Sequence, residues 1–220
     1  MGITLEEIKK DEEILAIIDR SDRNLKALGY TEHGLRHSKV TAKTSRLILE
    51  SLGVEPRKVE LSEIAAYLHD IGNLINREMH SQTGAAMLFT LLKEKGMPVN
   101  EVSDICAAVG NHHEEDGEPV SRIAAAVIIS DKADVHRSRV RNPKHIKFDI
   151  HDRVNYAVSS SKILILNNKK EIKLDIEVDT KISSVMEYFE IFLSRMIVSQ
   201  RAARYLEAEF QLVINNVRML

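Results

Sequence analysis

The sequence predicts a mainly α-helical protein that ends in a small β-β-α-β unit. Apolar residues recur at helical spacing through most of the first 140 positions, and Gly or Pro separates the segments. All nine glycines lie at or before Gly117 and the last proline is Pro143, so the final quarter of the chain has a different composition. We therefore expect a helical domain over residues 1–155 and a small α+β appendage over residues 156–220.

Short stretches that contain Gly or Pro divide the helical domain. They include Gly29 and the segments LGVEP at 52–56, KGMP at 95–98 and EEDGEP at 114–119. These residues interrupt helices because Gly loses more backbone entropy on folding and Pro lacks an amide donor. The helices expected between them cover residues 5–18, 21–28, 34–52, 58–71, 78–95, 99–111 and 120–139.

The appendage begins with two strand-forming runs. The segments KILIL (162–166) and IKLDIEV (172–178) flank NNKKE (167–171). This arrangement indicates a hairpin, because Asn tolerates the backbone angles that tight turns require. A long amphipathic helix over about 180–207 and a third strand at FQLVIN (210–215) are expected to follow.

The composition is that of an ordinary globular protein. Of the 220 residues, 44% are hydrophobic and 29% are charged, which suits one large domain or one domain with a small appendage. The formal net charge of −2 argues against a nucleic-acid-binding domain that relies on bulk charge. The chain also has no Trp, five Tyr and five Phe, so it offers few platforms for base stacking. We expect no nucleic-acid polymer as a partner.

Cysteine content and apolar runs bear on the cellular compartment. Cys106 is the single cysteine, which excludes an intrachain disulfide and a thiolate zinc cage. The first segment, MGITLEEIKKDEEILAII, carries acidic residues throughout and does not read as a signal peptide. The longest apolar run, Ile123–Ile129, is far shorter than the roughly 20 residues that span a bilayer. We expect a cytoplasmic protein without a membrane partner.

Polar side chains end or interrupt three strongly apolar runs. His69-Asp70 follows AAYL, His112-His113 follows ICAAVGN, and Asp131 follows IAAAVIIS. Burying an imidazole or a carboxylate without a partner costs several kcal/mol. A divalent cation removes that cost, because neutral imidazoles and carboxylates are its usual ligands. The three positions together therefore indicate a metal site.

The full series of these residues carries a family resemblance. His37, His69-Asp70, His80, His112-His113 and Asp131, set in LHDIG, NHHEEDG and IISDKAD, resemble the HD-domain metal-dependent phosphohydrolase superfamily over roughly residues 28–140. The additional histidines resemble its two-metal branch, which includes the HD-GYP cyclic-dinucleotide phosphodiesterases. The chain departs from that branch at Asn73, where the branch has Lys, and at EPV (118–120), where it has Gly-Tyr-Pro. The resemblance implies an HD helical bundle and its metal cradle, without the cyclic-dinucleotide specificity.

The resemblance also implies which residues hold two divalent ions. His37, His69, Asp70 and Asp131 would bind the first ion, and Asp70, His80, His112 and His113 would bind the second. Asp70 would bridge the ions through its two oxygens, so that His69 and Asp70 form the catalytic centre. A histidine-rich shell suits Fe, Mn, Zn, Ni or Co better than Mg. The ions would activate a water, and the resulting hydroxide would attack the phosphorus of a phosphate ester.

Candidates for substrate binding follow Asp131 in the segment DKADVHRSRVR (131–141). We expect these residues on one helix: Lys132, His136, Arg137, Arg139 and Arg141. They would either bind the substrate phosphate, for which Arg is suited, or form a solvated, salt-bridged face. His33 lies four residues before His37, and it would line the pocket or bind an extra ion if the helix begins there. Asn73 is a neutral candidate at the position of the Lys found in the related branch.

Three hypotheses describe the function. The first is a phosphohydrolase that cleaves a small, nucleotide-like phosphate ester at a two-metal site. The second is a one-metal nucleoside-monophosphate phosphatase, which needs only His37, His69, Asp70 and Asp131. The third is a non-catalytic nucleotide-sensing module whose C-terminal unit forms a dimer or partner surface. The metal count separates the first two hypotheses, and a homodimer is compatible with all three.

Overall fold

The computed structural model describes residues 2–146, 148–166, 168 and 170–220. The helices described are α1 (Leu5–Ile8), α2 (Glu12–Ala27), α3 (Leu35–Ser51), α4 (Pro56–Leu68), α5 (His80–Glu94), α6 (Val99–Gly110), α7 (Arg122–Ala133), α8 (Ile150–Ala157) and α9 (Val185–Tyr205). Short 3-10 helices are η1 (Ile71–Leu74), η2 (Arg137–Arg139) and η3 (Pro143–His145). The strands are β1 (Val158–Leu166), β2 (Glu171–Val178), β3 (Glu209–Ile214) and β4 (Val217–Arg218). The predicted fold class is confirmed.

Side-chain caps explain where the first helices begin and end. Asp11 caps α2 by accepting a hydrogen bond from the amide of Ile14 at 3.0 Å, so the chain breaks at residues 9–11. The predicted break between residues 18 and 21 is wrong, because the buried face of α2 continues through it. There Ser21 is buried and donates its hydroxyl to the carbonyl of Ile17 at 2.9 Å. α2 is therefore one helix.

The four strands form one sheet in the order β1-β2-β3-β4. β1 and β2 form the predicted antiparallel hairpin, and Asn168 between them has a φ of 54°. Asn167 and Lys169 of the same turn lie outside the described residues. β2 and β3 are parallel and α9 connects them, whereas β4 pairs antiparallel with β3. The elements α8 and β4 have no counterpart among the predicted ones, because they span only eight and two residues.

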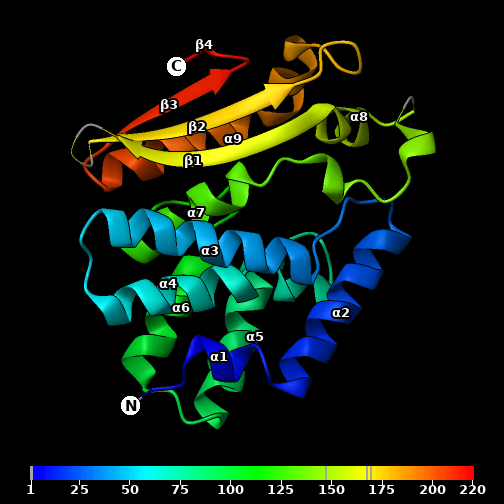
Figure 1. The fold of residues 1–220 in the computed structure, drawn as a ribbon. Helices are drawn as coiled ribbons and strands as arrows, with labels where there is room; N and C mark the ends of the chain where they lie inside the picture. The colour runs from blue at the N-terminus through cyan, green and yellow to red at the C-terminus, as the bar shows by residue number, and fades with distance from the viewer. Residues whose placement is uncertain (1, 147, 167, 169) are drawn as a thin grey trace.

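A continuous hydrophobic core joins the C-terminal unit to the helices. In Figure 1 the sheet lies above the helical part, with β1 nearest to α3, and α9 lies behind the strands. One cluster of buried side chains contains residues from both parts, among them Ile48, Leu49, Ala125, Ile128, Ile172, Phe192 and Leu212. A second cluster fills the space among α1, α2, α4, α5 and α6. The boundary predicted after residue 155 falls within α8, and the shared core extends across it.

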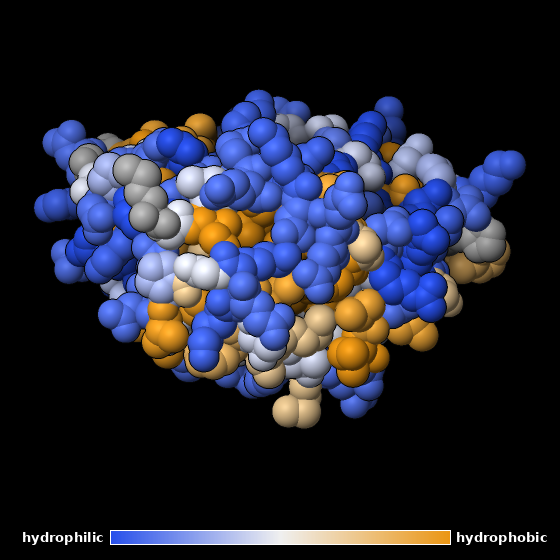
Figure 2. Space-filling model, turned by 90° about the horizontal axis from the view of Figure 1, so that it is seen from below, coloured by the Kyte–Doolittle hydropathy of each residue, from blue (hydrophilic) through white to orange (hydrophobic). Residues whose placement is uncertain are grey.

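The longest apolar segment of the chain is buried inside the protein. Ile123–Ile129 belongs to α7, and each of its side chains is at most 3% exposed. Among the described residues, no helix combines the length and apolar character needed to cross a bilayer. Figure 2 shows the molecule from below, with hydrophobic residues in patches between hydrophilic side chains.

The shared core predicts that the two parts unfold together. Leu212 of β3 is fully buried, whereas Leu193 of α9 is 52% exposed. Leu212→Ala should lower the free energy of unfolding by about 2–5 kcal/mol, because it leaves a cavity. Leu193→Ala is the matched control and should change it by less than about 0.5 kcal/mol. Urea unfolding followed by circular dichroism should show one transition for each variant; two separate transitions, only one of them shifted, would contradict a common core.

Candidate metal centre

Six polar side chains from five segments converge inside the helical part. They come from α3, the end of α4, α5, the end of α6 and α7, and are His37, His69, Asp70, His80, His112 and Asp131. Five of them are more than nine-tenths buried, and the side chain of Asp131 is 14% exposed. We call these six residues the metal cluster, because their arrangement matches that of ligands around cations.

Four atoms form the first group of this cluster. His37 Nε2 lies 3.1 Å from His69 Nε2, 3.3 Å from Asp131 Oδ1 and 3.7 Å from Asp70 Oδ2. His69 Nε2 lies 3.3 Å from Asp70 Oδ2 and 3.6 Å from Asp131 Oδ1. Ligand atoms about 2.1 Å from a tetrahedral ion lie roughly 3.4 Å from one another. The group therefore has the spacing of a coordination shell.

The second group uses the other oxygen of Asp70. His80 Nε2 lies 3.5 Å from Asp70 Oδ1 and 3.1 Å from His112 Nε2. The ligand atoms of these three residues all lie within 4.8 Å of one another. Asp70 thus presents Oδ2 to the first group and Oδ1 to the second, so one carboxylate joins both.

Backbone carbonyls fix the orientation of three imidazole rings. In each ring Nδ1 lies 2.6–2.9 Å from the carbonyl oxygen three residues earlier: His69 with Ala66, His80 with Arg77 and His112 with Val109. A carbonyl only accepts hydrogen bonds, so Nδ1 carries the hydrogen. In the neutral ring Nε2 is then a lone pair directed into the cluster.

A carboxylate plays the same part for the fourth ring. His37 Nδ1 lies 2.6 Å from Asp134 Oδ2, and Asp134 is also paired with Arg36 at 2.6 Å. Burial opposes ionisation of Asp134, but His37 and Arg139 outweigh it and hold the pKa of the carboxyl below its ordinary value. Asp134 therefore accepts from Nδ1, and His37 Nε2 also faces the cluster.

In the described part of the chain, two kinds of cluster atom have unsatisfied hydrogen-bonding capacity while the histidine rings are neutral. Two Nε2 lone pairs 3.1 Å apart cannot form a hydrogen bond unless one of them is protonated. Among the described residues, Asp70 Oδ2 is buried without a hydrogen-bond partner. A divalent ion would satisfy both kinds of atom, because imidazole nitrogens and carboxylate oxygens are common ligands of Zn, Fe and Mn. The donor set therefore fits one ion in each group.

The charges of the cluster perturb each other's ionisation. Burial lowers the pKa of His69, but Asp70 and Asp131 outweigh it and raise that pKa to about 10. For His80 burial dominates and lowers the pKa to about 4, with Arg77 adding to the effect. Despite burial, Asp70 has a pKa well below its ordinary value because His69 lies beside it. A proton on His69 thus supplies part of the positive charge that the carboxylates require.

A close backbone contact brings His80 beside Asp70. A Cβ atom at Gly72 would lie 1.9 Å from the carbonyl oxygen of His80 and 2.6 Å from the amide nitrogen of Gly84, so only Gly fits there. Met79 precedes His80 with a φ of 55°, a left-handed conformation that costs a residue with a side chain about 1–2 kcal/mol. The close packing at Gly72 and the strained turn at Met79 together place His80 in the second group.

Two predicted site residues lie next to the metal cluster. The ring of His113 lies 5.1 Å from that of His80, centroid to centroid, but His113 belongs to none of the ligand groups found among the described residues. Asn73 is buried and donates to Asp70 Oδ1 at 2.8 Å and to the Asp70 carbonyl at 2.9 Å. Asn73 therefore orients the shared carboxylate. Metal binding by His113 and substrate contact by Asn73 stay predictions.

The helix predicted over 120–139 is too long. α7 ends at Ala133. The next residue, Asp134, directs its carboxylate to His37 and Arg36, and the helix does not continue. The basic residues of 131–141 therefore do not share one helix. Lys132, His136, Arg137 and Arg141 each have a partner within the protein. Their contacts with substrate stay predictions.

These four side chains lie in different surroundings. Lys132 is buried between Asp131 at 2.7 Å and Glu114 at 2.6 Å. His136 forms hydrogen bonds with Ser138 and Ser159. The guanidinium of Arg137 lies over the ring of Tyr156, and Arg141 forms an ion pair with Asp22. Lys132 thus holds Oδ2 of Asp131 and leaves Oδ1 facing the histidines.

His33 lies beside the metal cluster although it precedes helix α3. α3 begins at Leu35, and His33 Nδ1 lies 2.7 Å from the carbonyl oxygen of Thr31. Its ring centroid is 5.6 Å from that of His37. Burial and the nearby Arg139 lower the pKa of His33 well below its ordinary value. The neutral ring lines the pocket that opens beside the cluster.

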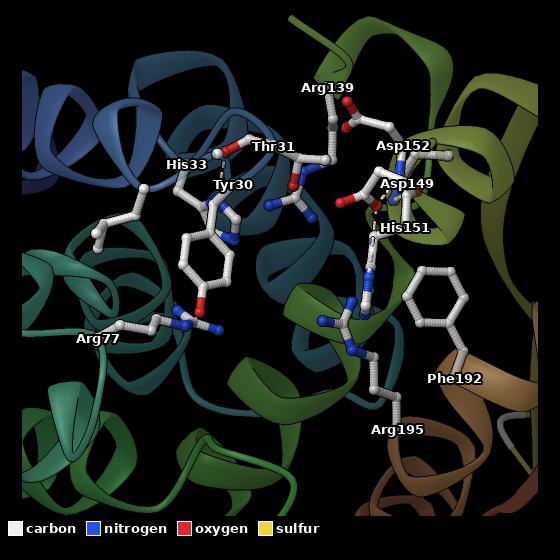
Figure 3. Close-up of a pocket in the computed structure, with 13 residues that line it drawn as sticks. Tyr30, Thr31, His33, Arg77, Arg139, Asp149, His151, Asp152, Phe192 and Arg195 are labelled. Atoms are coloured by element: carbon white, nitrogen blue, oxygen red, sulfur yellow. Dashed lines mark hydrogen bonds and ion pairs between the residues drawn. The ribbon is translucent and has the colours of Figure 1, made fainter. Parts of the chain in front are cut away.

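This pocket contains Arg139, which the sequence indicated as a substrate-binding candidate, and several residues that the sequence did not indicate. It has a volume of about 320 Å³, and Figure 3 shows its lining, which includes Tyr30, Arg77, Arg139, Phe192 and Arg195. Arg77 Nη1 lies 3.7 Å from Asp70 Oδ1 and 3.4 Å from His80 Nε2. The position of Arg77 three residues before His80 is the one signal that could have identified it. Phe192 and Arg195 lie in α9, far from every motif in the sequence.

The contact at Gly72 predicts a stability effect. Gly72→Ala should destabilise the protein by about 1–3 kcal/mol, because the added methyl group overlaps the backbone of α5. Gly110→Ala is the matched control, since a Cβ there would meet only Ala85 at 3.5 Å. Urea unfolding measures both variants, and equal stability of the two would contradict the close approach.

Comparisons with known proteins find similarity in the region that contains the metal cluster. The model of the HD domain family matches residues 34–137. An uncharacterized protein of Methanocaldococcus jannaschii is 27% identical over 187 residues, which cover 74% of this chain and 70% of that protein. Ribonuclease Y of Lawsonia intracellularis is 34% identical over 105 residues, which cover 46% of this chain and only 18% of that enzyme.

Among solved structures, a protein described as a predicted HD superfamily hydrolase from an uncultured Thermotogales bacterium aligns with a TM-score of 0.47 and 20% identity. The alignment covers 61% of this chain and 75% of that chain. All six residues of the metal cluster lie within the range that the family model matches. Residues 34–137 of the chain thus match the HD domain family.

Proposed function

We propose that this protein is a metal-dependent phosphohydrolase that cleaves a small phosphate ester at a two-metal site. The observation that carries the proposal is the carboxylate of Asp70, whose Oδ2 faces His37 and His69 and whose Oδ1 faces His80. An arrangement of this kind suits two ions that share one ligand, as in many enzymes of phosphate chemistry.

The ligand assignment follows the two groups. His37, His69, Asp70 and Asp131 would hold one ion, and Asp70, His80 and His112 would hold the other, with His113 as the candidate to complete the second shell. When bound, divalent ions supply Lewis acidity and lower the pKa of a coordinated water. The histidine-rich donor set favours Fe, Mn, Zn, Ni or Co over Mg.

Residues around the metal cluster position the ligands and the substrate. Asp134, Lys132 and Asn73 hold His37, Asp131 and Asp70 in place, which limits the motion of each ligand. Arg77 lies next to Asp70 and lines the pocket, so its guanidinium can bind the phosphate group as it approaches the cluster. His33 closes the same side with a neutral ring.

The alternative functions differ in what supports them. A one-metal nucleoside-monophosphate phosphatase would leave His80 and His112 without a role, yet their Nε2 atoms lie 3.1 Å apart with Nδ1 of each ring at a carbonyl. A nucleotide-sensing module would use the same pocket without turnover. One relative is named a ribonuclease, so RNA belongs among the substrates tested.

The shared carboxylate predicts the metal content of variants. The protein loaded with Mn, Fe or Zn should hold about two ions per chain, Asp70→Ala should lose both, and His80→Ala should keep about one. The control is His151→Ala, because that side chain is 62% exposed and lies outside the cluster. Elemental analysis after gel filtration measures the content. Wild-type metal content in Asp70→Ala would refute the bridging role.

The pocket predicts the size of the substrate. We expect the metal-loaded protein to release phosphate from mononucleotides or other small phosphomonoesters with a higher kcat/KM than from cyclic di-GMP. A pocket of about 320 Å³ suits one monomeric ligand. Activity should disappear with a chelator and in Asp70→Ala. A screen of phosphate esters, cyclic di-GMP and short RNA decides the matter, and preferential cleavage of either of the last two would contradict this substrate class.

A further inference from the structure

Parts of the chain outside the HD domain build most of the pocket beside the metal cluster. The loop before α3, η2, α8 and α9 form its walls. Among the described residues that line it, Arg77 alone lies within 34–137, the range of the family match. The cluster therefore lies within the range of the family match, whereas the surrounding segments of the chain build most of this pocket. A second pocket, lined by His80 and His113, is built mostly by the matched range.

Three guanidinium groups line this pocket. Figure 3 shows Arg77 and Arg195 on opposite sides and Arg139 at the top of the view. Arg195 Nε donates to Glu114 at 3.1 Å, and its guanidinium carbon lies 4.6 Å from the centroid of the Phe192 ring. These contacts hold Arg195 in place without using its two terminal nitrogens.

Arg139 carries a buried donor that no atom of the described residues accepts. Its side chain is buried, with Nε donating to the Glu32 carbonyl at 3.0 Å and Nη1 donating to the Asp134 carbonyl at 2.8 Å. Nη2 has no hydrogen-bond partner among the described residues. Burial lowers the pKa of Arg139; Asp134 and Asp131 oppose that shift, whereas Arg195 and Arg36 add to it. A buried guanidinium donor without an acceptor, in a pocket that Arg77 and Arg195 also line, indicates that an anion belongs there.

The wall formed by α8 has the opposite chemistry. Asn155 donates Nδ2 to the His151 carbonyl at 2.9 Å, which leaves its buried Oδ1 without a partner among the described residues. Asp149 and Asp152 line the same wall. These oxygens suit hydroxyl or amino groups of a ligand and disfavour a second anion on their own side.

Two of the three guanidinium groups, those of Arg139 and Arg195, lie away from the expected position of the reacting phosphate. Arg77 contacts Asp70 of the metal cluster directly, at 3.7 Å. Arg139 and Arg195 contact Asp134 and Glu114 instead, and these two acidic residues lie outside the cluster. A group bound by Arg139 and Arg195 therefore lies farther from the cluster than a phosphate bound by Arg77.

On the basis of the proposed function, we propose that Arg139 and Arg195 bind a second anionic group on the leaving group of the substrate. The substrate class is then a sugar or nucleoside bisphosphate, with its scissile phosphate at the metal cluster and hydroxyl groups toward Asn155. A guanidinium fork suits phosphate because it offers parallel donors as well as charge. Through Arg195, the C-terminal unit would contribute to the selection of the substrate.

A binding experiment tests the anion site without requiring turnover. Inorganic phosphate is titrated by calorimetry into protein stripped of metal by a chelator. Arg195→Gln should raise the dissociation constant roughly tenfold, the loss expected for a charged hydrogen bond. The matched control is Arg201→Gln, on the same helix but paired with Glu118 outside the pocket. Arg195→Lys retains the charge and should fall between Arg195→Gln and wild type; it replaces Arg195→Gln if that variant does not fold.

A kinetic experiment tests the substrate class. The ratio of kcat/KM for adenosine 3′,5′-bisphosphate to that for adenosine 5′-monophosphate, and for fructose 1,6-bisphosphate to fructose 6-phosphate, should exceed one in at least one pair. That ratio should fall about tenfold in Arg195→Gln and stay unchanged in Arg201→Gln.

The two experiments have separable outcomes. Undetectable phosphate binding by the wild type, equal binding by Arg195→Gln, or ratios at or below one in both pairs would overturn the anion site. Selective phosphate binding without hydrolysis of any ester would instead refute the proposed function and leave the anion site in place. Hydrolysis of monoesters with no effect of Arg195→Gln on the ratio would leave the proposed function and remove the anion site.

Discussion

The sharing of one carboxylate between two groups of lone pairs constrains the centre of this protein. Asp70 is buried, and each of its oxygens faces imidazole nitrogens that already donate through their other ring atom. Such an arrangement is unfavourable without positive charge, because lone pairs and a carboxylate repel one another in a medium of low polarity. The packing at Gly72, the turn at Met79 and the contact of Asn73 all hold this carboxylate and its neighbours in register.

The C-terminal unit is connected to this centre by packing and by charge. The hydrophobic core that includes β2, β3 and α9 also includes side chains of α3 and α7, the helices that carry His37 and Asp131. A series of ion pairs also connects α7 to α9: Asp131 pairs with Lys132, Lys132 with Glu114 and Glu114 with Arg195. The position of α9 therefore bears on the side chain of Asp131, although no residue of α9 belongs to the metal cluster.

The sequence predicted those features that depend on local patterns. Helical periodicity located most helices, and the Asn-containing turn located the hairpin. Each of these signals is contained in a short stretch of sequence, so it can be recognised without the tertiary structure. The histidines and aspartates of the cluster could be identified because each interrupts an apolar run or belongs to a family motif. The end of α7 could not be predicted, since it depends on Asp134 meeting His37, which lies 97 residues away in the chain. Arg195 could not be identified as pocket lining, because a charged side chain in a helix usually faces solvent. Arg139 was a candidate for phosphate binding, but the sequence did not show that it lies beside Arg195.

Three of the four clustered imidazoles are held by main-chain carbonyls three residues earlier in the chain, at residues 66, 77 and 109. A carbonyl is present whatever side chain a position carries, so evolutionary drift at these three positions leaves the ring orientation unchanged as long as the local turn is kept. His37 differs, because its partner is the side chain of Asp134, and one nucleotide change can remove that partner. The two halves of the centre are thus unequally exposed to mutation: the half around His80 and His112 is protected by the backbone, and the half around His37 depends on a single distant codon.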